Sequence, residues 1–143
     1  MSFISAIRSV FGMSEEVREE VRREINFFEA VEAHVAWKQR LVSYLQGASQ
    51  EKLEPHVICA DNRCTLGKWI HGSGKARFSE IPLFRQLTDE HAKFHYHAAQ
   101  VVEAHQAANP ALAEKLLSED FARQSKKTVD CLTRLHAQVS GKE

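Results

Sequence analysis

The chain has 143 residues, which suits one domain with a hydrophobic core of its own. Lysine plus arginine and aspartate plus glutamate both number 19, so the net charge is zero with histidine neutral. This balance gives no electrostatic footprint for nucleic acid, and we expect no nucleic-acid partner. Three cysteines fit a disulfide framework poorly and indicate a reducing compartment, so a cytoplasmic protein is expected.

The N-terminal segment, residues 1–13, is short and amphipathic and lacks the features of a signal peptide. It is predicted as a unit distinct from a single domain over 14–143. It could extend that domain, contact a second copy or dock on a partner. Membrane attachment is the least favoured role, because Arg8 is its only basic residue, and no window of the chain is long and apolar enough for membrane insertion.

A first long helix is predicted over 14–47. Ser14 followed by Glu15 and Glu16 supplies a capping hydroxyl and then acidic residues at the positive end of the helix dipole. Apolar residues then recur at helical spacing as far as Gly47. The members of this predicted stripe are Val17, Val21, Ile25, Phe28, Val31, Val35, Val42 and Leu45.

Residues 48–81 are less regular. Pro55 interrupts any long helix, and glycines at 67, 72 and 74 punctuate the rest. A short helix is predicted around 64–70, lying across one side of a bundle.

Two further long helices follow, the first from about Pro82 to Ala108. Asn109 and Pro110 provide the start of the second. Its apolar stripe weakens around 123–127, which predicts looser packing there. No segment alternates like a strand, so the fold class is all-α, an antiparallel helical bundle. The apolar positions are Leu83, Leu87, Phe94, Ala98, Val101 and Val102, then Leu117, Phe121, Leu132, Leu135 and Val139.

Two of the eight histidines, His91 and His95, lie one helical turn apart. Both fall within the apolar arc of their helix, so they face the bundle interior and can point at one metal ion. By itself this spacing is equally consistent with two core histidines bonded to carbonyl groups.

Two other residues are candidates for the same site. His34 lies seven residues after Phe27 and seven before Leu41, on the flank of the predicted stripe. A lone histidine there is more often a core or boundary residue than a ligand. Cys64 opens the predicted short helix, where a thiolate is favoured, although a single cysteine is usually a small buried apolar residue.

Together these residues form three ordered blocks that resemble the chemoreceptor zinc-binding (CZB) family. The blocks are HVAWK from His34, CTLGKW from Cys64, and His91-x-x-x-His95. The resemblance runs from about Phe27 to Val102, and the agreement of all three blocks is more specific than any one of them.

The resemblance implies an antiparallel four-helix bundle with an additional short helix carrying the cysteine ligand, often dimeric. It implies that His34, Cys64, His91 and His95 bind one Zn²⁺ ion. In this family such domains regulate chemoreceptors and diguanylate cyclases, and the zinc-bound cysteine is linked to sensing hypochlorous acid. We therefore expect a stand-alone zinc and oxidant sensor, a homodimer that acts in trans on a protein partner in bacterial chemotaxis or cyclic-di-GMP signalling.

Zinc chemistry supports a closed site, because four nitrogen and sulfur donors fill a tetrahedral shell and leave no place for a catalytic water. We expect no enzyme: no His-Glu-x-x-His motif occurs, and no carboxylate lies at the spacing that a di-iron site needs. Two alternatives stay open, a structural zinc staple of a dimeric bundle and a zinc buffer.

The remaining candidates are assigned lesser roles. His56 and Cys59 could supply alternative ligands, or Cys59 could trap an oxidised Cys64 as a disulfide. His105 lies too far along its helix from His95 to share the ion. The rest are assigned by position: Cys131, Trp37 and Trp69 to packing, Gly67 to a turn or a close helix approach, and His71, His97 and His136 to the surface or its edge.

Overall fold

The computed structural model describes residues 14–140, and the prediction for the N-terminal segment therefore lies outside the described part. Over 14–140 the chain is helical and has no strand, which confirms the all-α class. Within the same range, no helix has the length and apolarity to cross a bilayer.

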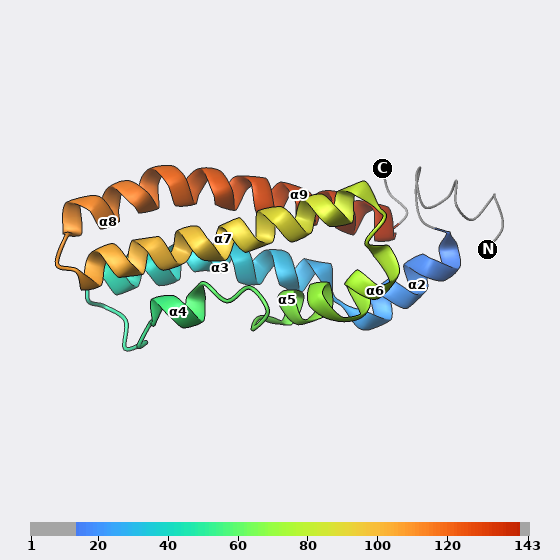
Figure 1. Ribbon diagram of the computed structural model, residues 1–143, viewed down its shortest axis with the longest axis horizontal. Coiled ribbons are helices and arrows are strands. Elements are labelled where there is room, and N and C mark those ends of the chain that lie inside the picture. The colour runs from blue at the N-terminus through green and yellow to red at the C-terminus, as the bar shows by residue number, and fades with distance from the viewer. Residues whose placement is uncertain (1–13, 141–143) are drawn as a thin grey trace.

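The chain makes four passes along an elongated molecule, alternately in one direction and the other (Figure 1). The second pass is a series of short segments, so the predicted regular four-helix bundle is not confirmed. The predicted short helix is present as α5. The elements are α2 (Glu15–Glu24) and α3 (Phe27–Leu45) in the first pass, α4 (Pro55–Ile58), α5 (Thr65–Trp69), η1 (Ile70–Gly74) and α6 (Lys75–Phe78) in the second, α7 (Pro82–Gln106) in the third, and α8 (Pro110–Leu116), η2 (Leu117–Phe121) and α9 (Ala122–Ser140) in the fourth.

The first pass is two helices, and the prediction of one continuous helix over 14–47 was wrong. Ile25 has an extended backbone (φ −148°, ψ 136°) that ends α2. Asn26 then caps α3, because its side-chain oxygen accepts the backbone N–H of Glu29 at 3.0 Å. An asparagine cap satisfies one of the amide groups that a new helix start leaves free. Ile25 itself is buried, so the interruption is part of the core.

The break also changes which face of α3 is buried. The sequence placed Phe28 and Val35 in the core, but these side chains are 60% and 54% exposed. The buried face instead carries Phe27, Ala30, His34 and Leu41. Both sets of residues have helical spacing. The number of apolar residues alone favoured the face that carries Phe28 and Val35, which the structure exposes. The correction moves His34 from the flank of the stripe to its centre.

Two groups of buried apolar side chains form the core, one toward each end of the molecule. On α3, His34 lies between Ala30 of the first group and Leu41 of the second. On α7, His91 lies between Leu87 of the first group and Phe94 of the second. The buried histidines therefore lie where the two groups meet, and polar side chains interrupt an otherwise apolar interior.

The middle of α9 packs closely, and the prediction of looser packing around 123–127 was wrong. Gln124 and Thr128 are buried. The Thr128 hydroxyl and the Gln124 amide donate to the main-chain oxygen of Glu90 on α7, at 3.0 and 3.1 Å. These hydrogen bonds satisfy the buried polar side chains. The prediction used apolar residues only and therefore read this polar stretch as loosely packed.

A cluster centred on Glu24 joins α2 to the second pass. Its carboxylate accepts the indole N–H of Trp69 at 3.1 Å and the hydroxyl of Ser73 at 3.0 Å. Arg77 donates to the same carboxylate at 2.7 Å and also pairs with Glu20. The Trp69 ring packs edge-on against Phe27 and Phe84. Helix α2 is thereby attached to the segment that begins at Cys64.

The turn after α7 contains one unfavourable backbone conformation. Ala108 has φ of 59°, in the left-handed region that favours glycine. We expect Ala108→Gly to raise the free energy of unfolding by up to about 1 kcal/mol, measured by urea denaturation. Ala107→Gly is the control, because Ala107 has φ of −82° and glycine should be neutral or destabilising there. Equal effects of the two changes would contradict the prediction.

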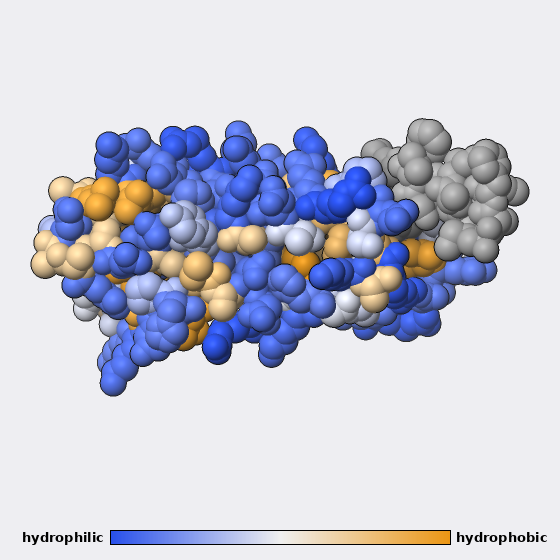
Figure 2. Space-filling model, viewed as in Figure 1, coloured by the Kyte–Doolittle hydropathy of each residue, from blue (hydrophilic) through white to orange (hydrophobic). Residues whose placement is uncertain are grey.

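The face shown in Figure 2 is mainly hydrophilic, with apolar surface gathered toward the end where α8 lies. Leu112 on α8 is 42% exposed. Scattered apolar residues of this kind are ordinary on a protein surface and define no site by themselves.

Candidate metal centre

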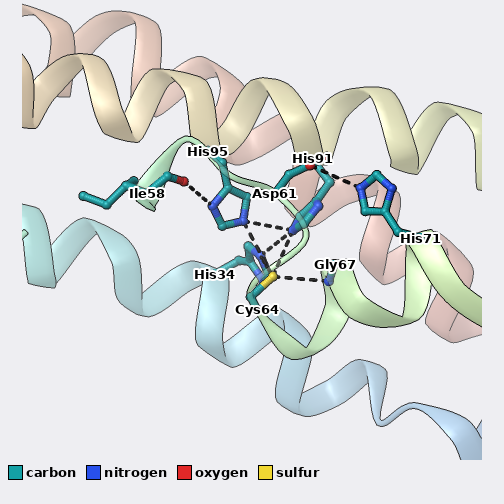
Figure 3. Close-up of polar contacts among 8 residues, drawn as sticks. All are labelled: His34, Ile58, Asp61, Cys64, Gly67, His71, His91 and His95. Carbon is teal, nitrogen blue, oxygen red and sulfur yellow. Dashed lines mark hydrogen bonds and ion pairs between the residues drawn. The ribbon is translucent and has the colours of Figure 1, made fainter. Parts of the chain in front are cut away.

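Four side chains from three passes converge on one point (Figure 3). His34 lies in the middle of α3, and His91 and His95 lie on successive turns of α7. Cys64 is the N-cap of α5, immediately before its first turn. One donor atom from each of these side chains lies within 4.8 Å of all the others. The structure thus brings together all four residues that the sequence predicted as ligands.

The donor atoms are the Nε2 nitrogens of the histidines and the sulfur of Cys64. Nε2 of His91 lies 3.1 Å from that of His34 and 3.0 Å from that of His95. The sulfur lies 3.3 Å from Nε2 of His91, 3.7 Å from that of His95 and 4.0 Å from that of His34. The four donor atoms therefore form a compact group.

Hydrogen bonds on the far side of two rings fix which nitrogen faces the centre. Nδ1 of His34 donates to the Ala30 carbonyl oxygen at 2.7 Å. Nδ1 of His95 donates to the Ile58 carbonyl oxygen at 3.0 Å. Because a neutral imidazole carries one N–H, Nε2 of each ring presents a lone pair to the centre. Metal-ligating histidines are held in this way by their second nitrogen.

Converging lone pairs suit a cation. In neutral form, His91 can supply at most one hydrogen from Nε2, while His34 and His95 both direct lone pairs at it. The side chains of all three histidines are buried, at 0–3% exposed. A tetrahedral ion with zinc bond lengths would set two nitrogen donors about 3.3 Å apart and nitrogen and sulfur about 3.6 Å apart. The observed separations of 3.0 to 4.0 Å fit such an ion.

Burial keeps the histidines neutral. It lowers the pKa of His91 to about 2, with further lowering from the neighbouring His95 and His34. It lowers the pKa of His95 to about 4, and it also lowers the pKa of His34. Neutral imidazole is the form that binds a metal, so without an ion the three imidazoles are already in the protonation state that binding needs.

The same pKa shifts predict how the metal-free protein responds to acid. The unfolded chain takes up protons on these histidines near pH 6.5, whereas the folded pKa values of His91 and His95 are about 2 and 4. The unfolded state therefore binds more protons below pH 6.5, and folding stability falls as the pH decreases. We expect a loss of up to about 1.4 kcal/mol per pH unit for each histidine. Urea midpoints of chelator-treated protein at pH 7.5, 6 and 5 measure it. A His91→Gln variant should show a shallower slope, and an unchanged slope would contradict the assignment.

Cys64 differs from the sequence expectation in one respect. Its position at the start of a helix predicted a favoured thiolate, but burial raises the pKa of the thiol. The N–H of Gly67 donates to the sulfur at 3.3 Å and acts in the opposite direction, without outweighing burial. In the metal-free protein the thiol is thus the stable form, and binding an ion releases its proton.

The backbone before α5 sets the place of Cys64. A side chain at Gly67 would clash with the main-chain oxygen of Asp61, because the loop crosses directly over the first turn of α5. This close approach confirms the role predicted for Gly67. The sequence did not identify Asp61, Ala30 or Ile58 as contributors, because main-chain contacts leave no signal in residue type.

Two hollows, of about 560 and 460 Å³, lead from the surface to the centre. His34 and Cys64 line both, and His95 lines the larger. Cys64 is the partly exposed member of the four donors. Small solutes can therefore reach the sulfur from the surface.

The lesser candidates lie outside the centre. Cys59 and His56 are both exposed, and the converging group contains neither. Cys131 is buried, as predicted for a packing residue. His105 packs against Tyr44, and His71 pairs with Asp61 at 3.2 Å. The predicted distance of His105 from the site is consistent with its absence from the group.

The fold and the site together define a class of protein: a helical bundle whose interior carries a three-histidine, one-cysteine metal centre. Residues 34–102 match the model of a family described as the chemoreceptor zinc-binding domain, CZB. The matched region begins at His34 and includes the other three donors, so the match to this family covers the whole candidate site. No match was found among curated proteins or among solved structures.

Proposed function

We propose that this protein is a zinc-binding regulatory module that senses zinc and oxidants through the centre formed by His34, Cys64, His91 and His95. The observation that carries the proposal is the unequal exposure of the donors. The three histidines are buried, whereas Cys64 is half-buried and lines both hollows. Three ligands are protected and the oxidisable one is accessible, which suits a site that must respond to its surroundings.

Zinc is the metal proposed, because three imidazoles and one thiolate are a donor set that zinc binds and that magnesium or calcium does not. The family match supports the same ion. Four protein donors complete a tetrahedral shell, so the module is proposed to regulate and not to catalyse a reaction.

Oxidation at Cys64 is the proposed signal. Hypochlorous acid transfers its oxygen to the thiolate, giving a sulfenic acid and chloride, and the sulfur loses its negative charge. A weaker fourth ligand loosens the ion. Cys64 is the donor from the second pass, whereas the others come from α3 and α7. Its loss removes the link that the ion makes between α5 and the other two passes, although Trp69 on α5 still contacts Glu24, Phe27 and Phe84. The partner is proposed to detect this loosening.

The output is proposed to pass through protein contacts. Phe28 and Val35 lie seven residues apart on α3 and are exposed, which offers an apolar face for a homodimer. A partner of the chemoreceptor or diguanylate cyclase type, in the cytoplasm, follows from the family resemblance. Sedimentation of wild type and of a Phe28→Glu, Val35→Glu variant tests the dimer, which the variant should weaken.

A structural zinc staple is the second candidate, and one observation favours it. The four donors come from three separate passes, so an ion bound to them would cross-link the bundle whether or not it also acts as a signal. A zinc buffer would use the same site. A staple holds its ion under mild oxidant, whereas a sensor releases it.

Metal analysis with oxidant treatment tests the proposal. Purified protein should contain one zinc per chain, and alanine at any of the four donors should reduce that content. Stoichiometric hypochlorite should release zinc from wild type while helical circular dichroism is retained. A Cys59→Ser variant is the control and should respond like wild type. Zinc content unaffected by both hypochlorite and Cys64→Ser would remove the oxidant-sensing role and leave the staple.

A further inference from the structure

One buried nitrogen at the metal centre has no partner. Nδ1 of His91 is a fully buried side-chain nitrogen without a hydrogen bond from any described protein group. Nδ1 of His34 and Nδ1 of His95 each donate to a carbonyl oxygen. When Nε2 of His91 binds an ion, Nδ1 carries the hydrogen and needs an acceptor. A buried donor left unpaired costs about 1–3 kcal/mol.

The charge of the loaded centre also needs compensation. A divalent ion with one thiolate and three neutral imidazoles has a net charge of about +1. A buried net charge is costly unless an opposite charge lies beside it. A carboxylate is the partner of His91 that would satisfy both the hydrogen bond and the charge.

Asp61 is placed to be that carboxylate. Asp61 lies three residues before Cys64. Its main chain passes over the first turn of α5, in close approach to Gly67. Figure 3 shows its carboxylate joined by a dashed line to the ring of His71, with the side chain of His91 drawn next to it in that view. In this structure Asp61 pairs with Nε2 of His71 at 3.2 Å. Burial dominates the pKa of both Cys64 and His95, and the charge of Asp61 adds only a small upward contribution to each.

We propose that Asp61 is the positioning residue of the metal centre: when the ion binds, its carboxylate accepts the Nδ1 hydrogen of His91 and gives up its pairing with His71. This inference rests on the proposed metal binding and names the residue that completes it. The exchange is inexpensive, because the side chain of His71 is 41% exposed and water can replace the lost contact. His91 has no such replacement, since its ring is fully buried.

Zinc affinity of three variants tests the assignment. Asp61→Ala removes the acceptor and the charge, and Asp61→Asn keeps an acceptor oxygen but removes the charge. His71→Ala is the matched control, because it removes the other partner of Asp61. By competition with a chromophoric chelator, Asp61→Ala should weaken zinc binding by about 10- to 100-fold, as loss of such an outer partner does elsewhere. The zinc affinity of Asp61→Asn should lie between those of Asp61→Ala and wild type. His71→Ala should bind zinc as tightly as wild type or more tightly.

Nitrogen-15 NMR of the zinc-loaded protein separates positioning from a general effect on folding. Three ring N–H signals are expected, one for each ligating histidine. The His91 signal should shift in Asp61→Asn and be lost to solvent exchange in Asp61→Ala, whereas those of His34 and His95 stay in place. If Asp61→Ala does not fold, the isosteric Asp61→Asn variant decides by the same signal.

Three results would overturn the assignment: zinc affinity of both Asp61 variants equal to wild type, an unchanged His91 signal, or an equal loss of affinity in His71→Ala. Wild-type protein that binds no zinc would instead overturn the proposed function, so the two failures are distinguishable.

Discussion

Gly67→Ala should abolish tight zinc binding and destabilise the folded protein by about 3 kcal/mol or more, a loss typical of overpacking at a site that cannot relax. An added methyl group would overlap the main-chain oxygen of Asp61. The loop before Cys64 and the first turn of α5 must then separate. The Gly67 N–H also donates to the Cys64 sulfur, so the separation displaces the ligand itself.

Zinc content and urea denaturation measure the two effects. Lys68→Ala is the matched control, because the side chain of this neighbour on α5 is exposed and the substitution keeps its main-chain hydrogen bond to Cys64, so it should change neither quantity. Wild-type zinc content in Gly67→Ala would show that the loop can move aside without displacing Cys64.

Chelation of zinc should lower the thermal midpoint of the protein by roughly 10 °C. An ion present at 100 times its dissociation constant stabilises the folded state by about 2.7 kcal/mol, and each kcal/mol shifts the midpoint of a chain of this size by about 3–4 °C. The removal also leaves three buried imidazoles with converging lone pairs. Differential scanning calorimetry with and without a chelator measures the shift.

Hydrogen exchange can locate that destabilisation. We expect faster exchange in α4 and α5 on chelation, because Cys64 and the Ile58 carbonyl tie the second pass to the histidines. Helix α9, which supplies no donor, should retain its protection. In Cys64→Ala the chelator should have a much smaller effect. A shift as large in that variant as in wild type would contradict the prediction.

The ligand residues could be predicted from sequence because each is fixed by side-chain chemistry and spacing. His91 and His95 are one turn apart on a helix with a clear apolar face, and the family pattern added His34 and Cys64. The structure brings these four together. The family itself is matched over the region that contains them.

The errors in the first pass have a common physical cause. An apolar stripe through Val17, Val21 and Ile25 can be continued in phase only if the helix is unbroken. The chain leaves the helix at Ile25 and starts again at Asn26, and this changes the phase of α3. Asn26 followed three residues later by Glu29 is a helix-start signal that could have revealed the break.

Main-chain contacts account for most of what the sequence could not supply. The carbonyl groups of Ala30 and Ile58 orient two ligand rings, and the main chain of Asp61 sets the position of α5. Any residue type carries the same carbonyl group, so no pattern of side chains can reveal these roles. Only the tertiary arrangement of the passes does.

The contact between Trp69 and Glu24 gives the protein an optical reporter without a label. The chain has two tryptophans, and Trp37 lies under the guanidinium of Arg40 at 3.8 Å. The Trp69 indole lies five residues from Cys64, in an apolar pocket closed by a carboxylate. The emission wavelength of Trp69 depends on its hydrogen bond to Glu24 and on the exclusion of water. A shift of α5 away from α2 therefore changes that wavelength. In a Trp37→Phe background, emission spectra recorded during zinc titration follow the segment that carries the cysteine in real time.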